Sequence, residues 1–142
     1  MRVSEIMTYG VDFLVSSDPV KKAAERMRDK NIGVIPIFEG GEPVGMLTDR
    51  DIALRVVAEG RDPSTVRVSD VMTPDVVFCY EDQDIEDAVD IMEQRKIRRL
   101  LVKNFKDEVV GVLSTGDIAM STTKELVGEL IKEVSGVAYP ER

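Results

Sequence analysis

Arg2-Val3-Ser4-Glu5-Ile6-Met7-Thr8 returns further along the chain as Arg67-Val68-Ser69-Asp70-Val71-Met72-Thr73. The same register continues through matching apolar positions, and a single extra residue then enters the second copy in a polar turn. After that turn, Val44-Gly45-Met46-Leu47-Thr48 is matched by Val110-Gly111-Val112-Leu113-Ser114. Because the matches fall at apolar and glycine positions and the length change falls in a turn, we interpret the chain as two copies of one structural unit.

Each copy has the pattern of a strand, a helix, two strands and a second helix. In the first copy, residues 11–15 and 33–37 are apolar runs typical of strands, and Val20, Ala23 and Met27 recur at helical spacing. We therefore expect an α/β fold of two βαββα repeats, packed sheet-to-sheet with pseudo-two-fold symmetry. The expected boundaries are 1–60 for the first repeat, 61–66 for a linker and 67–142 for the second repeat, which ends with a helix over residues 123–134.

The composition limits the classes of function. The 142 residues include 27 acidic and 19 basic side chains, and the net charge of -8 argues against binding to nucleic acid or to an anionic membrane. The chain has no His, which excludes His-dependent catalysis and His metal sites, and its one Cys, Cys79, permits no intrachain disulfide. No apolar stretch reaches the roughly 18 residues that span a bilayer. We therefore expect a cytoplasmic protein that is not an enzyme.

The ordered motifs resemble a tandem pair of CBS domains, the module named after cystathionine β-synthase. The resemblance rests on the opening V-x-(D/E)-(I/V)-M-T, on the strand at residues 32–37, and on the ending G-h-L-(S/T)-x-x-D-I. It implies a regulatory module of the kind that often binds an adenosine-containing ligand in the cleft between repeats and often dimerises. No further domain is left over in the sequence, so the chain resembles a stand-alone pair.

Two strand-to-helix turns carry the clearest binding signal. Thr48 precedes Asp51 by three residues, and Ser114 precedes Asp117 by the same spacing. A helix N-terminus presents N–H groups to a phosphate, and a carboxylate accepts hydrogen bonds from ribose hydroxyls. The resemblance implies these roles for both pairs. The same spacing is also that of a helix capping box, and the two roles are compatible.

Lys96-Ile97-Arg98-Arg99-Leu100 places cations beside a strand of an acidic protein. The resemblance implies that a basic pair at this position contacts ligand phosphates, for which the planar Arg fork is suited. The alternative is a surface ion pair with acids such as Glu93, which contributes little. The first copy has Gly33-Val34 at the matching positions. We therefore expect an asymmetric module with one stronger phosphate site, and Arg50 is the candidate cation of the weaker one.

An adenine ring needs an apolar slot. The resemblance implies a slot near Gly10-Val11 and Ile35-Pro36, and near Asp75-Val76 and Leu100-Leu101, with core packing as the alternative for each residue. The candidate nucleotide-binding residues are Gly10, Val11, Ile35, Pro36, Thr48, Arg50, Asp51, Asp75, Val76, Arg98, Arg99, Leu100, Ser114, Thr115 and Asp117. We predict no catalytic residue and no metal site.

The function expected from these features is ligand sensing. AMP, ADP or ATP is the expected ligand, no cofactor is required, and an unidentified regulated protein is the expected partner. A homodimer is expected through exposed apolar positions such as Leu54, Val57, Leu130 and Ile131. Two alternatives stay open, namely a protein-interaction module without nucleotide, and a binder of another adenosine compound such as S-adenosylmethionine or NAD.

Overall fold

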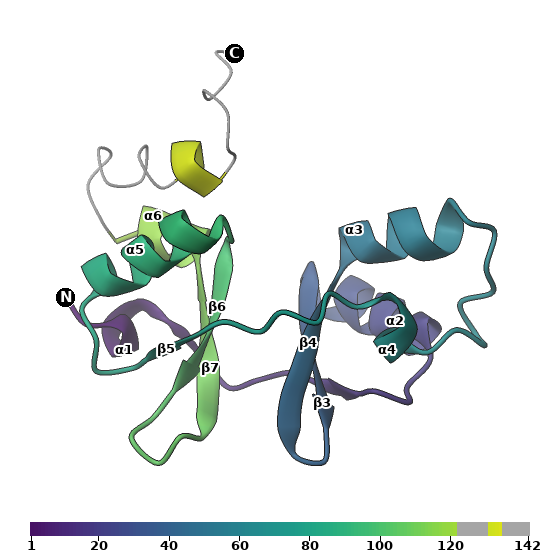
Figure 1. Cartoon of the computed structure of the whole chain (residues 1–142), viewed down its shortest axis with the longest axis horizontal. Helices are drawn as coiled ribbons and strands as arrows, with labels where there is room; N and C mark the ends of the chain where they lie inside the picture. Colours follow the sequence, from purple (N-terminus) through teal and green to yellow (C-terminus); the bar gives the residue numbers. More distant parts are fainter. Residues whose placement is uncertain (122–130, 135–142) are drawn as a thin grey trace. The chain divides into compact units, whose positions relative to one another are not determined.

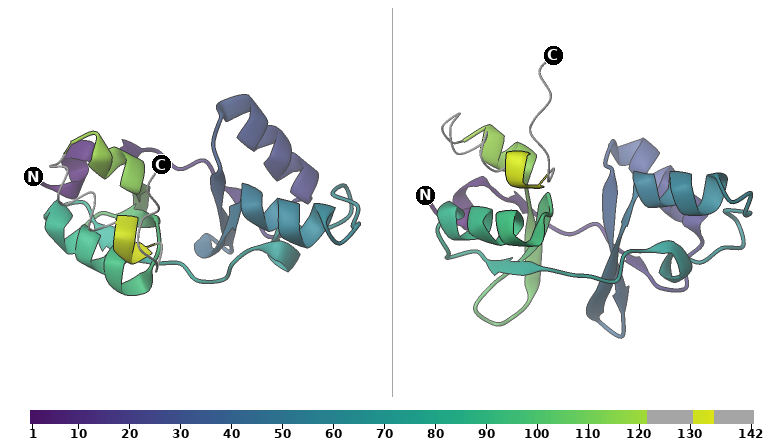
Figure 2. Two further views of the ribbon diagram at one scale, coloured as in Figure 1. Left: turned by 90° about the horizontal axis from the view of Figure 1, so that it is seen from above. Right: turned by 45° about the horizontal axis from the view of Figure 1, so that its top comes forward.

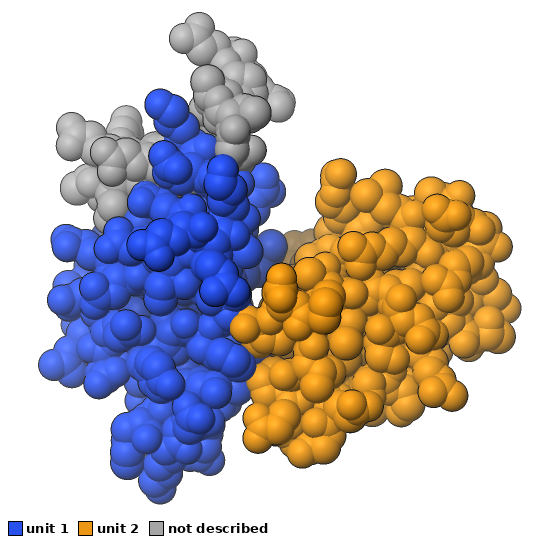
Figure 3. Space-filling model, in the orientation of Figure 1, with its two compact units in different colours: residues 1–11, 77–142 blue, residues 12–76 orange. Residues whose placement is uncertain are grey.

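The computed structural model describes residues 1–121 and 131–134, and the chain forms two compact units (Figure 1, Figure 3). Unit 1 comprises Met1–Val11 and Val77–Arg142, and unit 2 comprises Asp12–Val76. Each unit therefore combines most of one repeat with the opening segment of the other. The mixed α/β fold with two repeats is confirmed, and the boundaries of the repeats along the sequence stay a prediction.

Unit 1 is a four-stranded sheet with helices on one of its faces (Figure 2). Its elements are α1 (Val3–Ile6), β1 (Thr8–Tyr9), β5 (Phe78–Tyr80), α5 (Ile85–Arg95), β6 (Arg99–Lys103), β7 (Val109–Ser114) and α6 (Thr115–Ala119). The strand order is β1-β7-β6-β5, in which only β5 and β6 are parallel. Ala88 and Met92 of α5 pack in one core with Leu100 and Leu113 of the sheet, as the helical spacing of apolar residues predicts.

Unit 2 repeats this arrangement with one strand fewer. Its elements are β2 (Leu14–Val15), α2 (Val20–Lys30), β3 (Val34–Glu39), β4 (Glu42–Thr48), α3 (Asp49–Ile52), the π-helical η1 (Ala53–Val57) and α4 (Val68–Val71). The sheet order is β2-β3-β4. Ala23 and Met27 of α2 pack in one core with Ile35 and Leu47 of the sheet. The two repeats therefore bury equivalent side chains.

The two opening segments dock in equivalent ways. In unit 1, the Val3 N–H donates to the Gln83 carbonyl oxygen at 2.8 Å, and β1 continues the sheet beside β7. In unit 2, the Val68 N–H donates to the Asp18 carbonyl oxygen, also at 2.8 Å. Each opening segment therefore satisfies backbone groups of the other repeat rather than of its own.

Two matching glycines permit this docking. A Cβ built on Gly111 would lie within 3.0 Å of the Thr8 carbonyl oxygen, and one built on Gly45 would lie within 3.0 Å of the Thr73 carbonyl oxygen. Both obstacles are backbone atoms, which cannot rotate out of the way as a side chain can. The absence of a side chain at Gly45 and Gly111 is therefore what allows the opening segments to lie against β4 and β7.

Asp12, the first residue of unit 2, is the centre of an ion-pair cluster. Its carboxylate accepts a hydrogen bond from the Arg26 guanidinium and lies 2.8 Å from the Lys30 ammonium nitrogen. Burial raises the pKa of Asp12, whereas the contacts with Lys30 and Arg26 lower it by more, so that the net pKa lies below the ordinary value of 3.8. The cluster fixes the start of unit 2 to α2.

We expect Asp12→Asn to reduce the acid sensitivity of the fold. A carboxyl group whose pKa is depressed on folding stabilises the protein above its unfolded pKa, and this stabilisation is lost as the pH falls through the folded value. The variant should be less stable than the wild type near neutral pH, and the two should converge well below pH 3.8 in urea unfolding curves. The exposed Asp82 gives the control Asp82→Asn. A difference in the free energy of unfolding between wild type and Asp12→Asn that stays constant with pH would contradict the lowered pKa of Asp12.

Candidate functional site

Both strand-to-helix turns are capping boxes. The Thr48 hydroxyl accepts from the Asp51 N–H at 3.1 Å, and the Thr48 N–H donates to Asp51 Oδ2 at 2.9 Å. The Ser114 hydroxyl accepts from the Asp117 N–H at 3.1 Å, and the Ser114 N–H donates to Asp117 Oδ2 at 2.9 Å. Capping therefore uses one carboxylate oxygen, Oδ2, in each turn. The second oxygen, Oδ1, takes no part in the cap.

The second carboxylate oxygens have different surroundings. Asp51 is only 8% exposed, and its Oδ1 lies 3.9 Å from a guanidinium nitrogen of Arg55, which also donates to the Val71 carbonyl oxygen at 2.9 Å. Asp117 is half-buried, and Ser121 stands at the position that matches Arg55. Within residues 1–121 and 131–134, no side chain pairs with Asp117 Oδ1. Asp117 therefore keeps an acceptor for a ligand hydroxyl, whereas Asp51 serves the structure of unit 2.

Arg99 and Ser114 share one face of the unit 1 sheet. They are directly opposite in the antiparallel pairing of β6 with β7, and cross-strand partners project to the same side. The next pair along the strands, Leu100 with Leu113, lies in the core. Because side chains alternate along a strand, Arg99 and Ser114 project from the face opposite the core.

Arg98 lies beside the start of α6. Its carbonyl oxygen accepts from the Thr115 N–H at 3.0 Å, which fixes the backbone at the strand end against the helix start. Arg98 and Arg99 are both exposed. Within the part of the chain that the structure describes, neither guanidinium forms an ion pair. The surface ion pair considered from the sequence is therefore not seen there, and two cations stand beside the Ser114 turn.

The matching turn of unit 2 lacks the cation that Arg98 brings to unit 1 and has an additional carboxylate instead. Gly33 takes the place of Arg98, and Asp49 takes the place of Thr115, with the Asp49 N–H donating to the Gly33 carbonyl oxygen at 3.0 Å. Asp49 Oδ1 accepts from the Arg50 N–H at 2.9 Å, and the Arg50 side chain is exposed. A second carboxylate beside this turn repels a phosphate. The two turns therefore differ in the charge beside them, and the stronger phosphate site expected in the second repeat stays a prediction.

The remaining candidate nucleotide-binding residues lie partly in unit 1 and partly in unit 2. Unit 1 holds Gly10, Val11 and Leu100, and unit 2 holds Ile35, Pro36, Asp75 and Val76. The side chains of Ile35 and Leu100 lie in the two cores, so that only their backbone atoms could meet a ligand. Pro36 and Leu101, which follow them on the strands, project to the other face. Both side chains are buried, and Leu101 is only 1% exposed, so the adenine slot stays a prediction.

Two residues of this region were not anticipated from the sequence. Arg55 neutralises Asp51, and Asp49 brings a second negative charge to the unit 2 turn. The signal for both was present in the repeat alignment, where Arg55 is matched by Ser121 and Asp49 by Thr115. Differences between the copies, rather than identities, identify these residues.

The described residues contain no group of metal-ligating side chains and no helix long and apolar enough to cross a membrane. Cys79 is buried, and burial raises the pKa of its thiol to about 12, so that it is not a reactive nucleophile. Leu54 and Val57 are exposed, and Ile131 is half-buried. Leu130 and most of the helix predicted over residues 123–134 lie outside the described residues.

The sequence model of the CBS domain matches residues 3–58 and 68–122. The chain belongs to the CBS-domain family. A CBS pair is a ligand-sensing regulatory module, and the two matched segments account for both repeats. They also include both capped turns and the Arg98-Arg99 pair.

Similar CBS proteins are known from sequence and structure. The CBS domain-containing protein YhcV of Bacillus subtilis is 38% identical over 134 residues, which cover 94% of each chain. The crystal structure of the CBS domain protein TA0289 from Thermoplasma acidophilum has a TM-score of 0.83 at 20% identity and covers 98% of this chain and 79% of that one. The CBS domain pair of protein MJ0100, solved with 5′-methylthioadenosine and S-adenosyl-L-methionine, has a TM-score of 0.71 at 24% identity, covering 84% and 94%.

Proposed function

We propose that this CBS pair is a cytoplasmic regulatory module that senses an adenine nucleotide (AMP, ADP or ATP), and that its stronger site lies in unit 1. The observation that carries the proposal is the Arg98-Arg99 pair, exposed and without an ion-pair partner among the described residues, beside a turn whose Asp117 keeps one open carboxylate oxygen. A guanidinium binds phosphate bidentately, and a carboxylate accepts from hydroxyl groups.

The phosphate and the ribose of a nucleotide each have a candidate contact in unit 1. Arg99 and the Ser114 hydroxyl project from one face and suit the phosphate, while Asp117 Oδ1 suits the ribose hydroxyls. No contact is assigned to the adenine ring, because Leu101 on the same face is only 1% exposed. Such a ligand regulates only if two states of the module bind it with different affinity. The nucleotide would shift the equilibrium between those states.

The choice among adenosine compounds depends on charge. Protein MJ0100 was solved with two adenosine compounds, 5′-methylthioadenosine and S-adenosyl-L-methionine, which supports an adenosine group as the common part of the ligand. Neither compound carries a phosphate. The paired cations Arg98 and Arg99 favour a ligand with a phosphate group, and therefore a nucleotide over S-adenosylmethionine.

A homodimer forms part of the proposal. Leu54 is 49% exposed and Val57 is 71% exposed, and both lie on η1 of unit 2. Large apolar side chains with this exposure on one helix are typical of a contact with another protein. A second copy of the chain would bury them.

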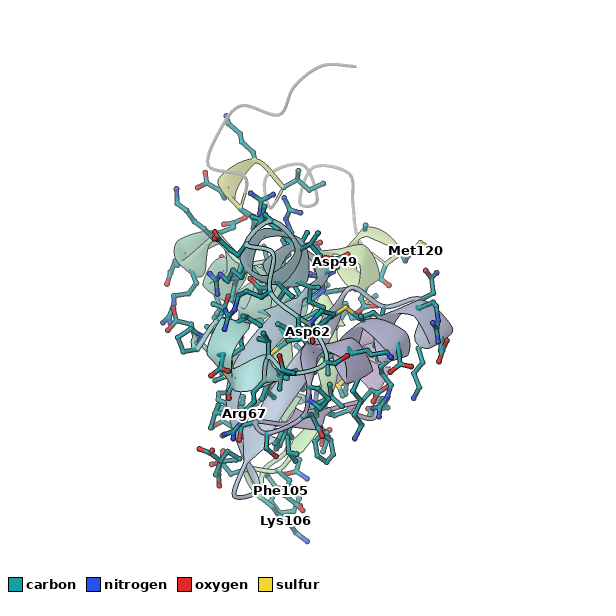
Figure 4. All side chains as sticks on the ribbon, turned by 90° about the vertical axis from the view of Figure 1, so that its right-hand side faces the viewer. Asp49, Asp62, Arg67, Phe105, Lys106 and Met120 are labelled. Atoms are coloured by element: carbon teal, nitrogen blue, oxygen red, sulfur yellow. The ribbon has the colours of Figure 1, made fainter. Side chains whose placement is uncertain are left out.

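Protein interaction without nucleotide is the second candidate, and Phe105 favours it. This side chain is 87% exposed at the tip of the β6–β7 hairpin (Figure 4). The Asn104 side-chain oxygen accepts from the Lys106 N–H at 2.9 Å and from the Glu108 N–H at 3.0 Å, which fixes the turn that presents Phe105. An exposed aromatic ring on a fixed turn suits insertion into a pocket of a partner protein.

Isothermal titration with AMP, ADP and ATP tests the nucleotide proposal. We expect Asp117→Ala to weaken binding about tenfold through the lost hydrogen bonds to ribose, and to lower the free energy of unfolding by about 1 kcal/mol through the lost cap. The matched control is Asp51→Ala, which also breaks the contact with Arg55. It should lower stability more and nucleotide affinity less.

Two outcomes would contradict the proposal. Flat heats for all three nucleotides with folded wild-type protein would leave protein interaction through Phe105 as the better candidate. The second outcome is that Asp117→Ala and Asp51→Ala lower the free energy of unfolding equally and do not differ in nucleotide affinity. Both carboxylates would then act only as helix caps.

A further inference from the structure

The strand-to-helix turns of the two units share a backbone arrangement but differ in two side chains. Unit 2 has Asp49 where unit 1 has Thr115, and it has Gly33 where unit 1 has Arg98. The Thr115 N–H donates to the Arg98 carbonyl oxygen at 3.0 Å. The Asp49 N–H donates to the Gly33 carbonyl oxygen, also at 3.0 Å. The side chains alone therefore distinguish the two turns at these positions.

The Asp49 carboxylate lies over the point where the arginine side chain begins in the other unit. Its Oδ1 accepts from the Arg50 N–H at 2.9 Å. Its Oδ2 lies 3.2 Å from the position that a Cβ on Gly33 would take. The side chain is exposed (Figure 4) and forms no ion pair with any other side chain of residues 1–121 and 131–134. Unit 2 thus presents an unneutralised carboxylate at the place where unit 1 presents a cation.

The other charged groups of this turn do not cancel the charge of Asp49. The guanidinium of Arg55 lies 3.9 Å from Asp51 Oδ1 and donates to a backbone carbonyl oxygen of α4, so it is held beside Asp51. Arg50 is exposed, and its guanidinium forms no ion pair within the described ranges. The groups with fixed positions are therefore two carboxylates and one guanidinium.

We propose that Asp49 determines the ligand specificity of unit 2, so that this turn excludes phosphate and takes an adenosine compound whose 5′ group carries no negative charge. A phosphate at this turn would lie beside the Asp49 carboxylate, and like charges at close range repel each other even in water. A neutral 5′ group avoids this repulsion, and an ammonium group is attracted. The two turns thereby distinguish two classes of adenosine compound. This inference rests on the proposed function and adds the specificity of its second site.

Three ligands that differ only in the 5′ group test this specificity. Adenosine is neutral, AMP carries a phosphate, and 5′-amino-5′-deoxyadenosine carries an ammonium group. Two-dimensional amide NMR of the full chain follows the two turns separately, because the Thr48 and Ser114 amides each donate to the capping Asp of their own turn. Titration of either amide gives the affinity at that turn.

Two variants and one control isolate the contribution of the carboxylate. Asp49→Asn removes the charge and keeps the shape, while Asp49→Thr/Gly33→Arg gives unit 2 the two side chains of unit 1. Glu42→Gln is the control, because it removes an exposed carboxylate at the other end of β4. Circular dichroism confirms that each variant is folded.

In the wild type, we expect the Thr48 amide to report about tenfold higher affinity for 5′-amino-5′-deoxyadenosine than for AMP, with adenosine between them. This preference should shrink at about 1 M salt, where charges are screened within a few ångströms. Asp49→Asn should reduce it to about twofold and leave the Ser114 response unchanged. The double variant should bind AMP at the Thr48 turn at least tenfold more tightly than the wild type, and Glu42→Gln should match the wild type.

The contrary results separate this inference from the proposed function. Equal affinity of the wild-type Thr48 turn for AMP and for the amine, or an unchanged preference in Asp49→Asn, would overturn the role of Asp49 and leave the proposed function in place. A Thr48 amide that responds to no ligand, while AMP shifts the Ser114 amide, would overturn the inference in the same way. If no ligand shifts either amide, the proposed function itself fails.

Discussion

Gly111→Ala is expected to lower the free energy of unfolding of the protein by about 3 kcal/mol, at the upper end of the usual effect of overpacking. The new Cβ would lie within 3.0 Å of the Thr8 carbonyl oxygen, and this backbone atom can move only if the opening segment leaves β7. Urea unfolding measures the loss. Hydrogen exchange at the Val3 amide, which donates to Gln83, reports whether the segment is released before the rest of unit 1 unfolds.

Gly116→Ala is the matched control for this prediction. A Cβ at Gly116 would lie 3.5 Å from the Ser114 hydroxyl oxygen, which is an ordinary contact, and Ala is the better helix former in α6. We expect unchanged or slightly increased stability. Gly45→Ala should reproduce the Gly111 effect in unit 2, because the Thr73 carbonyl oxygen lies in the matching position. Equal stability of Gly111→Ala and wild type would mean that the opening segment is not held against β7.

The sequence predicts the two repeats and their elements because apolar spacing is a local signal. It does not predict which repeat receives each opening segment. Residues 2–8 and 67–73 are nearly the same, so either segment fits either sheet by pattern alone. The folded units show instead the space beside Gly45 and Gly111 that each segment occupies. The sheet-to-sheet packing expected from the repeats stays a prediction.

The asymmetry of the candidate site was predictable for the same reason. Gly33 against Arg98 is a difference that can be read directly from the aligned copies. The role of Arg55 was harder to predict from the sequence. Its spacing from Asp51 suggests a helical ion pair, but its hydrogen bond to the Val71 carbonyl oxygen joins residues that only the folded unit brings together. That contact gives Asp51 a neighbour in unit 2 that Asp117 lacks among the described residues, while its role as a ligand contact stays a prediction.

Removal of both guanidinium groups should have the largest effect on the proposed function. We expect Arg98→Ala/Arg99→Ala to weaken ATP binding about 100-fold, because a charge-assisted hydrogen bond contributes about 1.5–3 kcal/mol and two cations are lost. Adenosine, which has no phosphate, should bind the wild type and the variant equally. Isothermal titration of both ligands measures the difference. Stability should hardly change, since both side chains are exposed and unpaired within the described residues.

Arg50→Ala provides the control in the other repeat. It removes an exposed cation beside the unit 2 turn, where Asp49 and Asp51 already disfavour phosphate, and should leave the affinity for ATP within about twofold. If the Arg98→Ala/Arg99→Ala variant lost ATP and adenosine affinity to the same extent, the arginines would be supporting the shape of the site rather than binding phosphate. If Arg50→Ala caused the larger loss, the stronger site would lie in unit 2, and the charge difference between the two turns would not determine where the nucleotide binds.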